Sequence, residues 1–105
     1  MDNFKAVYKI LAALEAGMDS PEFDVDQISP EVLAVSKERW AKYLQMMQDV
    51  GYISGVEVHT YITGVSVNAR SIAITLKGLE YLQENSMMQK AYRAIKGTRD
   101  IVPGI

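Results

Sequence analysis

Residues 36–82 read SKERWAKYLQMMQDVGYISGVEVHTYITGVSVNARSIAITLKGLEYL, and the succession of patterns in this stretch determines the fold class. Ser36 precedes a run with apolar residues at helical spacing, and Gly51 ends that run. β-Branched segments follow as far as Thr75, where a second helical pattern begins. A helix, a β-hairpin and a further helix in this order are typical of a winged helix-turn-helix, in which the first of these helices enters a DNA groove beside the hairpin.

The flanking segments predict a mainly α-helical domain with a small β-hairpin, which is an α+β fold. We expect a first helix over residues 2–16, a short extended arm over residues 22–27, and a short helix that begins at Ser29-Pro30-Glu31. An additional C-terminal helix is predicted from residue 87 to about residue 96. The winged-helix domain would therefore cover residues 1–96, and residues 97–105 would form a flexible tail.

Helical spacing also assigns residues to the core. The expected core positions are Phe4, Val7, Leu11, Leu14, Trp40, Leu44, Met47, Val50, Leu76, Leu79 and Leu82. Gly78 is expected to allow close packing near the start of its helix. Residues 52–58 (YISGVEV) recur as residues 61–67 (YITGVSV), which predicts two similar β-segments that lengthen the hairpin.

Composition limits the classes of protein to which the chain can belong. Its 105 residues suit one domain, and the absence of cysteine excludes disulfides and a cysteine zinc finger. A net charge of −2 counts against a dedicated nucleic-acid binder. The charges are segregated, however, because residues 15–31 contain six acids and no base, whereas residues 87–99 contain four bases and no acid. Such segregation can leave a basic face on an acidic protein.

No pattern for membrane insertion or catalysis stands out. The apolar runs are too short to span a bilayer and no signal peptide begins the chain, so we expect a cytoplasmic protein with no membrane contact. His59 is the only histidine, and no nucleophile elbow or glycine-rich phosphate loop is present. We therefore expect no enzyme activity, no cofactor, and no catalytic or metal-binding residue.

Three blocks of the chain resemble the YjcQ family. They are GYI with GV at residues 51–56, TLKGLEYLQEN at residues 75–85 and KAYRAIK at residues 90–96. The resemblance implies a small winged-helix fold of Gram-positive bacteria and their phages and prophages. It implies no activity and no known functional residues, and the repeated hairpin segment departs from the shorter hairpin of the family.

The leading functional hypothesis is a DNA-binding regulator of the phage or prophage type that contacts double-stranded DNA. Its candidate DNA-binding residues are Ser36, Lys37, Arg39, Lys42, Gln45, Arg70, Lys90 and Arg93. Glu38, Gln48 and Asp49 are expected on the same solvent face of the helix, where the two acids would repel phosphate.

The alternative hypothesis is a winged-helix module that binds a protein partner, or forms a homodimer, without binding DNA. The hairpin from residue 55 to residue 69 contains no lysine or arginine and is rich in valine, which favours packing or strand pairing over phosphate contact. Adjacent methionines at 46–47 and 87–88 predict that one member of each pair faces outward or into an interface. The interface would be the hairpin or the helix over residues 87–95.

Overall fold

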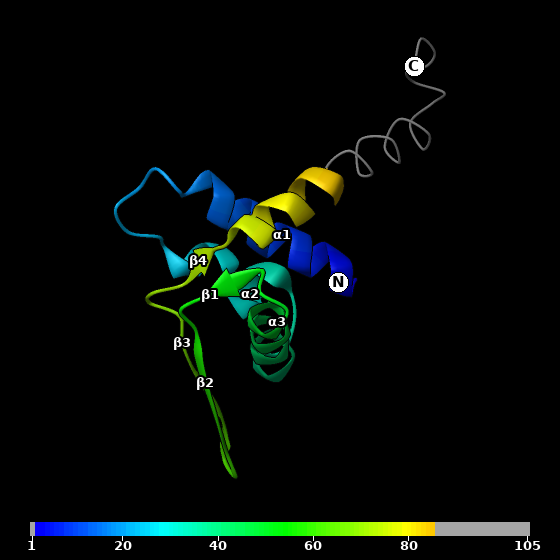
Figure 1. The fold of residues 1–105 in the computed structure, drawn as a ribbon. Helices are drawn as coiled ribbons and strands as arrows, with labels where there is room; N and C mark the ends of the chain where they lie inside the picture. Colours follow the sequence, from blue (N-terminus) through cyan, green and yellow to red (C-terminus); the bar gives the residue numbers. More distant parts are fainter. Residues whose placement is uncertain (1, 86–105) are drawn as a thin grey trace.

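The computed structural model describes residues 2–85. The elements are α1 (Asn3–Ala16), the 3₁₀ helix η1 (Val25–Ile28), α2 (Pro30–Leu33), α3 (Lys37–Asp49), β1 (Ile53–Ser54), β2 (Glu57–Tyr61), β3 (Gly64–Asn68) and β4 (Ala73–Ile74). A further helix covers residues 76–85 (Figure 1). The predicted helix over residues 87–96, the tail over residues 97–105, and the candidate residues Lys90 and Arg93 lie outside the described part of the chain.

Serine and threonine side chains begin the helices as predicted. Ser29 Oγ accepts a hydrogen bond from Val32 N at 3.2 Å, and Ser36 Oγ accepts one from Arg39 N at 3.1 Å. Thr75 Oγ1 accepts one from Gly78 N at 3.1 Å. Each bond satisfies an amide that would otherwise have no partner at the helix N-terminus.

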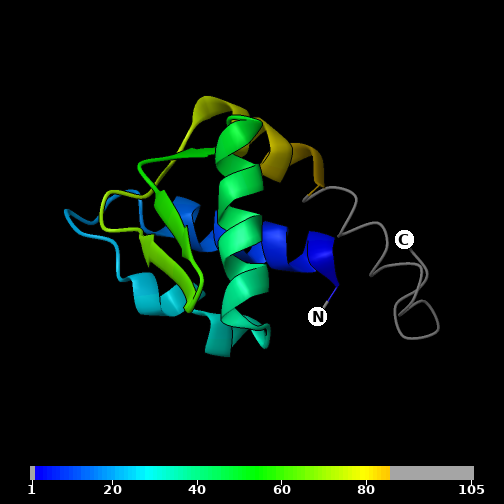
Figure 2. The same cartoon turned by 90° about the horizontal axis from the view of Figure 1, so that it is seen from below.

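One hydrophobic core joins the helices. Ile10 and Leu11 of α1 and Leu44 of α3 are fully buried, and Figure 2 shows α3 crossing α1. The 2.7 Å hydrogen bond from Trp40 Nε1 to the carbonyl oxygen of Ile28 fixes the buried tryptophan against η1. In the chain, the α2–α3 pair is followed by a hairpin, and the whole is an α+β fold.

The β-structure consists of a short ladder at the core and a longer hairpin that projects from it (Figure 1). β1 pairs with β4 in antiparallel fashion, and β2 pairs with β3 from Glu57↔Asn68 to Tyr61↔Gly64. Gly55 lies between the two ladders with a φ of 81°, and a Cβ there would lie 1.9 Å from the carbonyl oxygen of Ser71. Glycine is therefore required at this point by both conformation and space.

The repeated segment does not form two equivalent strands. Its first copy contributes to both β1 and β2, whereas its second copy begins at Tyr61, the last residue of β2, and continues through the turn into β3. Antiparallel register brings only one pair of repeat-equivalent positions opposite each other, Val58 and Val67. Each copy thus has a different structural environment, so the prediction of two similar β-segments is wrong.

Three predicted core residues and one predicted arm are wrong. Phe4, Val50 and Leu76 are exposed, because each lies at an end of its helix, where packing against the other elements is incomplete. The expected extended arm over residues 22–27 instead contains the start of η1, whose first turn is stabilised by a 3.0 Å bond from Asp26 N to Asp24 Oδ1. None of the helices between residues 2 and 85 is long and apolar enough to cross a membrane.

Candidate nucleic-acid interface

The N-terminal half of α3 carries the densest group of candidate DNA-binding residues. Lys37, Arg39 and Lys42 are all exposed, and Glu38 is the one acid among residues 36–42, which leaves a local net charge of +2. The exposed Ser36 caps this end of the helix. The positive end of the helix dipole adds to the charge of the three side chains, so this surface can attract phosphate.

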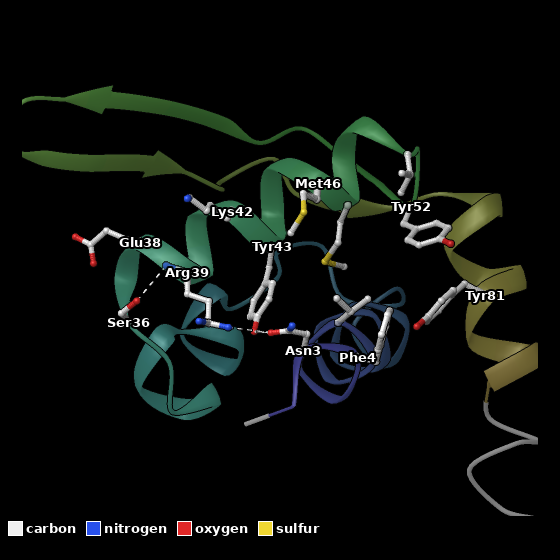
Figure 3. A pocket seen from close by; sticks show the side chains of 13 residues that line it. Asn3, Phe4, Ser36, Glu38, Arg39, Lys42, Tyr43, Met46, Tyr52 and Tyr81 are labelled. Carbon is white, nitrogen blue, oxygen red and sulfur yellow. Dashed lines mark hydrogen bonds between the residues drawn. The ribbon is translucent and has the colours of Figure 1, made fainter.

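Arg39 is partly committed to a structural contact. Its Nη1 donates a 3.1 Å hydrogen bond to Asn3 Oδ1, which also accepts a bond from the Tyr43 hydroxyl (Figure 3). These bonds connect α3 to the N-terminus of α1. A guanidinium group has five N–H donors, so Arg39 keeps donors for a further partner. Lys37 and Lys42 are the more available cations of the group.

Two further candidates, Gln45 and Arg70, lie within residues 2–85. Gln45 is half-buried, and its Nε2 donates to Asp49 Oδ1 at 3.0 Å. Arg70 borders a hollow beside Gln48, at the root of the hairpin and the C-terminal end of α3. That end lies about 20 Å from Ser36 at 1.5 Å per helical residue. The structure therefore groups Ser36, Lys37, Arg39 and Lys42, and it separates Arg70 from them.

Gln48 has a role that sequence reasoning missed. Its Nε2 donates to the carbonyl oxygen of Val56 at 2.8 Å, and its Oε1 accepts from Val56 N at 2.8 Å. The side chain thus pairs with the backbone as a β-strand would and connects α3 to the start of the hairpin. The prediction that Gln48 faces solvent is wrong, because the helical pattern does not show that the hairpin returns to this position.

The hairpin differs in chemistry from the end of α3. Within its strands β2 and β3 there is no lysine or arginine, and Glu57 is exposed. Tyr61 is 59% exposed, and Ile62 at the tip is fully exposed. The rings of His59 and Tyr61 lie 6.5 Å apart on β2. Within residues 2–85 there is no group of three side chains that could hold a metal ion. The tip therefore offers apolar contact rather than phosphate contact.

An apolar groove of about 660 Å³ runs between α1, α3 and the helix over residues 76–85 (Figure 3). Phe4 is 74% exposed, Met46 55% and Val50 49%, and all three line the groove. Met47 is buried, so the prediction that one member of the Met46–Met47 pair faces outward is confirmed. The methionine pair was the one sequence signal that pointed to this surface.

Tyr52 and Tyr81 close one end of the groove. Their rings lie 4.8 Å apart at an interplanar angle of 43°. Burial raises the pKa of the Tyr81 hydroxyl, and the nearby Tyr52 hydroxyl raises it further. Tyr81 therefore remains a neutral hydrogen-bonding group over the physiological pH range.

Comparisons with known proteins identify a family. The family model described as YjcQ protein matches residues 8–101, which is most of the chain. No curated protein and no solved structure matches the chain. The matched range includes α3, the hairpin and all three blocks from which the resemblance was predicted.

Proposed function

We propose that this chain, which belongs to the YjcQ family, binds double-stranded DNA as a regulator of the phage or prophage type. The observation that supports the proposal is the exposed group of Lys37, Arg39 and Lys42 around the serine-capped N-terminus of α3. In helix-turn-helix proteins, the N-terminal residues of the recognition helix contact base edges. The proposal includes no catalytic activity.

The distribution of charge supports this surface over others. Residues 2–85 contain seven cations and twelve acids, so the described part of the chain is acidic as a whole. Six of the acids fall between Glu15 and Glu31, whereas the N-terminus of α1 contacts Arg39. Glu15 lies about 18 Å along α1 from Asn3 at 1.5 Å per residue. Glu15 therefore lies beyond the screening length at physiological salt, which is about 8 Å. Glu31, in contrast, is only five residues before Ser36, so its charge opposes phosphate binding at this end of α3.

The proposal is tested by fluorescence anisotropy of a labelled random DNA duplex, titrated with the full chain at low salt and again as salt is raised. We expect micromolar binding that weakens steeply with salt, because phosphate neutralisation releases counterions. The Lys42→Ala substitution should weaken binding. It should also reduce by about 1 the steepness with which the logarithm of the affinity falls with the logarithm of the salt concentration. Lys77→Ala is the matched control, since Lys77 is exposed beside Gly51 at the other end of α3.

Two results would contradict the proposal in different ways. Equal affinities of the Lys42→Ala and Lys77→Ala variants would show that the N-terminal half of α3 is not the DNA surface. Flat anisotropy of the parent at about 50 µM protein would remove non-specific DNA affinity, whose dissociation constants are typically about 1–100 µM.

A second candidate function is protein binding through the hairpin. It is favoured by the exposed apolar tip, Tyr61 and Ile62, on strands that carry no lysine or arginine. A partner could pair with a hairpin edge or bury the tip, and a second copy of the chain could do the same. Sedimentation equilibrium of the parent and of Ile62→Asp tests the homodimer form, because a charge at the tip should dissociate it. A monomeric parent would exclude that form.

A further inference from the structure

The apolar groove between α1, α3 and the helix over residues 76–85 exposes side chains that folded domains usually cover. Phe4, Met46 and Val50 come from two different helices and line one continuous surface. Figure 3 shows Phe4 and Met46 from α1 and α3 bordering this hollow, with Tyr52 and Tyr81 at one end of it. Contiguous exposed apolar surface of this kind marks a binding site for another segment or molecule.

We propose that residues 88–95 of the same chain dock in this groove as an amphipathic helix. Met88, Ala91, Tyr92 and Ile95 are spaced as i, i+3, i+4 and i+7, which is the anchor pattern of a helix bound in an apolar groove. Lys90, Arg93 and Lys96 recur every third residue on the other side of the same helical wheel. Docking would bury the apolar stripe and leave the basic row in solvent.

The position of the tether selects this occupant over a second copy of the chain. Tyr81 lines the groove, and it lies one helical turn before Asn85, the last described residue. Two residues separate Asn85 from Met88, so the tether keeps the segment within reach of the groove. A short tether gives an effective concentration in the millimolar range, which a second molecule does not reach in dilute solution.

The length of the groove also suits a helix over residues 88–95. The groove follows α3 from Glu38 to Val50, about 18 Å at 1.5 Å per helical residue. A helix over residues 88–95 is about 12 Å long and therefore fits along it. Arg39 and Lys42 line the same groove, so docking would place the basic row of the segment near the basic half of α3. The inference does not depend on DNA binding, because the contact that drives it is apolar.

The test uses the full chain and a single spin label. Because the chain has no cysteine, Gln89→Cys gives one attachment site for a nitroxide. We expect the label to broaden the methyl NMR signals of Val7, Met46 and Val50, and to leave the Ile62 methyls at the hairpin tip sharp. The broadening should persist at high salt, since an apolar contact does not depend on charge pairing.

Two further samples separate the possible occupants. In a mixture of isotope-labelled parent with unlabelled spin-labelled protein, we expect no broadening, because the contact is within one chain. Adding Met46→Asp to the spin-labelled chain should restore sharp Val7 and Val50 signals, whereas Ile62→Asp should not. Absence of broadening in the first sample would overturn the proposal. Broadening that appears in the mixture would overturn it as well, because the occupant would then be a second copy.

Discussion

The bidentate contact between Gln48 and Val56 predicts that one polar side chain of α3 holds the root of the hairpin. The amide group of Gln48 is half-buried and forms two 2.8 Å hydrogen bonds with the backbone of Val56, a residue that is itself buried. Replacing Gln48→Ala removes both bonds and keeps the helix. The loss therefore falls on the connection between α3 and the hairpin.

The size of the effect follows from the two bonds and from the groups left behind. Each bond contributes about 0.5–1.5 kcal/mol, and a buried backbone group without a partner costs about 1–3 kcal/mol. We expect Gln48→Ala to lower the free energy of unfolding by about 2–4 kcal/mol, which is a large part of the stability of a small domain. Gln45→Ala is the matched control: the same substitution, in the same helix, removes only the contact with Asp49. Its expected cost is below about 0.5 kcal/mol.

The assay is urea unfolding followed by the fluorescence of Trp40, the single and buried tryptophan of the chain. Native-state hydrogen exchange of the Val56 amide gives a local readout, and its protection should fall in Gln48→Ala but not in Gln45→Ala. If the two variants differ by less than about 0.5 kcal/mol, the pairing of Gln48 with Val56 does not stabilise the fold and the reasoning is refuted.

A charged variant gives the same test a pH dependence. In Gln48→Glu, a carboxylate can still accept from the Val56 amide but cannot donate to the Val56 carbonyl, whereas the protonated acid can do both. The folded state therefore favours the neutral acid and raises the pKa of this side chain above its unfolded value of about 4.3. The stabilisation is present below that unfolded pKa and is lost as pH rises through the folded pKa. The loss of unfolding free energy in Gln48→Glu, relative to the parent, should therefore be smallest at acidic pH.

Three other substitutions test the core and the tyrosine pair. Gly78→Ala should cost about 1–3 kcal/mol in urea unfolding, because its Cβ would lie 2.3 Å from the Tyr52 carbonyl oxygen. Trp40→Phe should cost about 2–4 kcal/mol by circular dichroism, since it removes the buried bond to Ile28 and leaves a cavity. Burial raises the pKa of Tyr81, so its neutral form adds stability below the unfolded value of about 10, which is lost as pH rises through the raised folded pKa. Tyr81→Phe should therefore reduce the fall in urea midpoint between pH 8 and pH 11.

Helix starts could be predicted from the sequence because they depend on neighbouring residues only. Ser29, Ser36 and Thr75 all cap the helices that were predicted to follow them, through bonds that span three residues. The steric role of Gly78 was predictable for a related reason, since glycine near a helix start indicates the close approach of another element.

Burial at the helix ends could not be predicted in the same way. Helical spacing identified the apolar stripes of α1 and α3, but it does not show how far along each stripe the neighbouring elements extend. Phe4, Val50 and Leu76 continue their stripes by sequence, and each lies at an end of its helix where packing is incomplete. Two of these exposed residues, Phe4 and Val50, help to form the groove.

The contact of Gln48 with Val56 and the different structures of the two repeat copies could not be predicted for another reason. Both depend on how strands far apart in sequence are brought together, and antiparallel register makes repeat-equivalent residues face different neighbours. The same limit applies to Arg70, which sequence order places near the hairpin but not on a particular side of α3. Candidate site residues on one helix could be grouped from the sequence, whereas those on different elements could not.

The two halves of α3 support different interactions, which differ in how they depend on salt concentration. The N-terminal half exposes Lys37, Arg39 and Lys42, and any DNA contact there must weaken as counterions compete for phosphate. The C-terminal half exposes Met46 and Val50, and an apolar contact in the groove must persist under the same conditions. If residues 88–95 occupy the groove, the bases of that segment join the cations of α3. The Met46→Asp variant, which releases the segment, should then bind DNA more weakly than the parent at low salt, although Met46 itself contributes no charge.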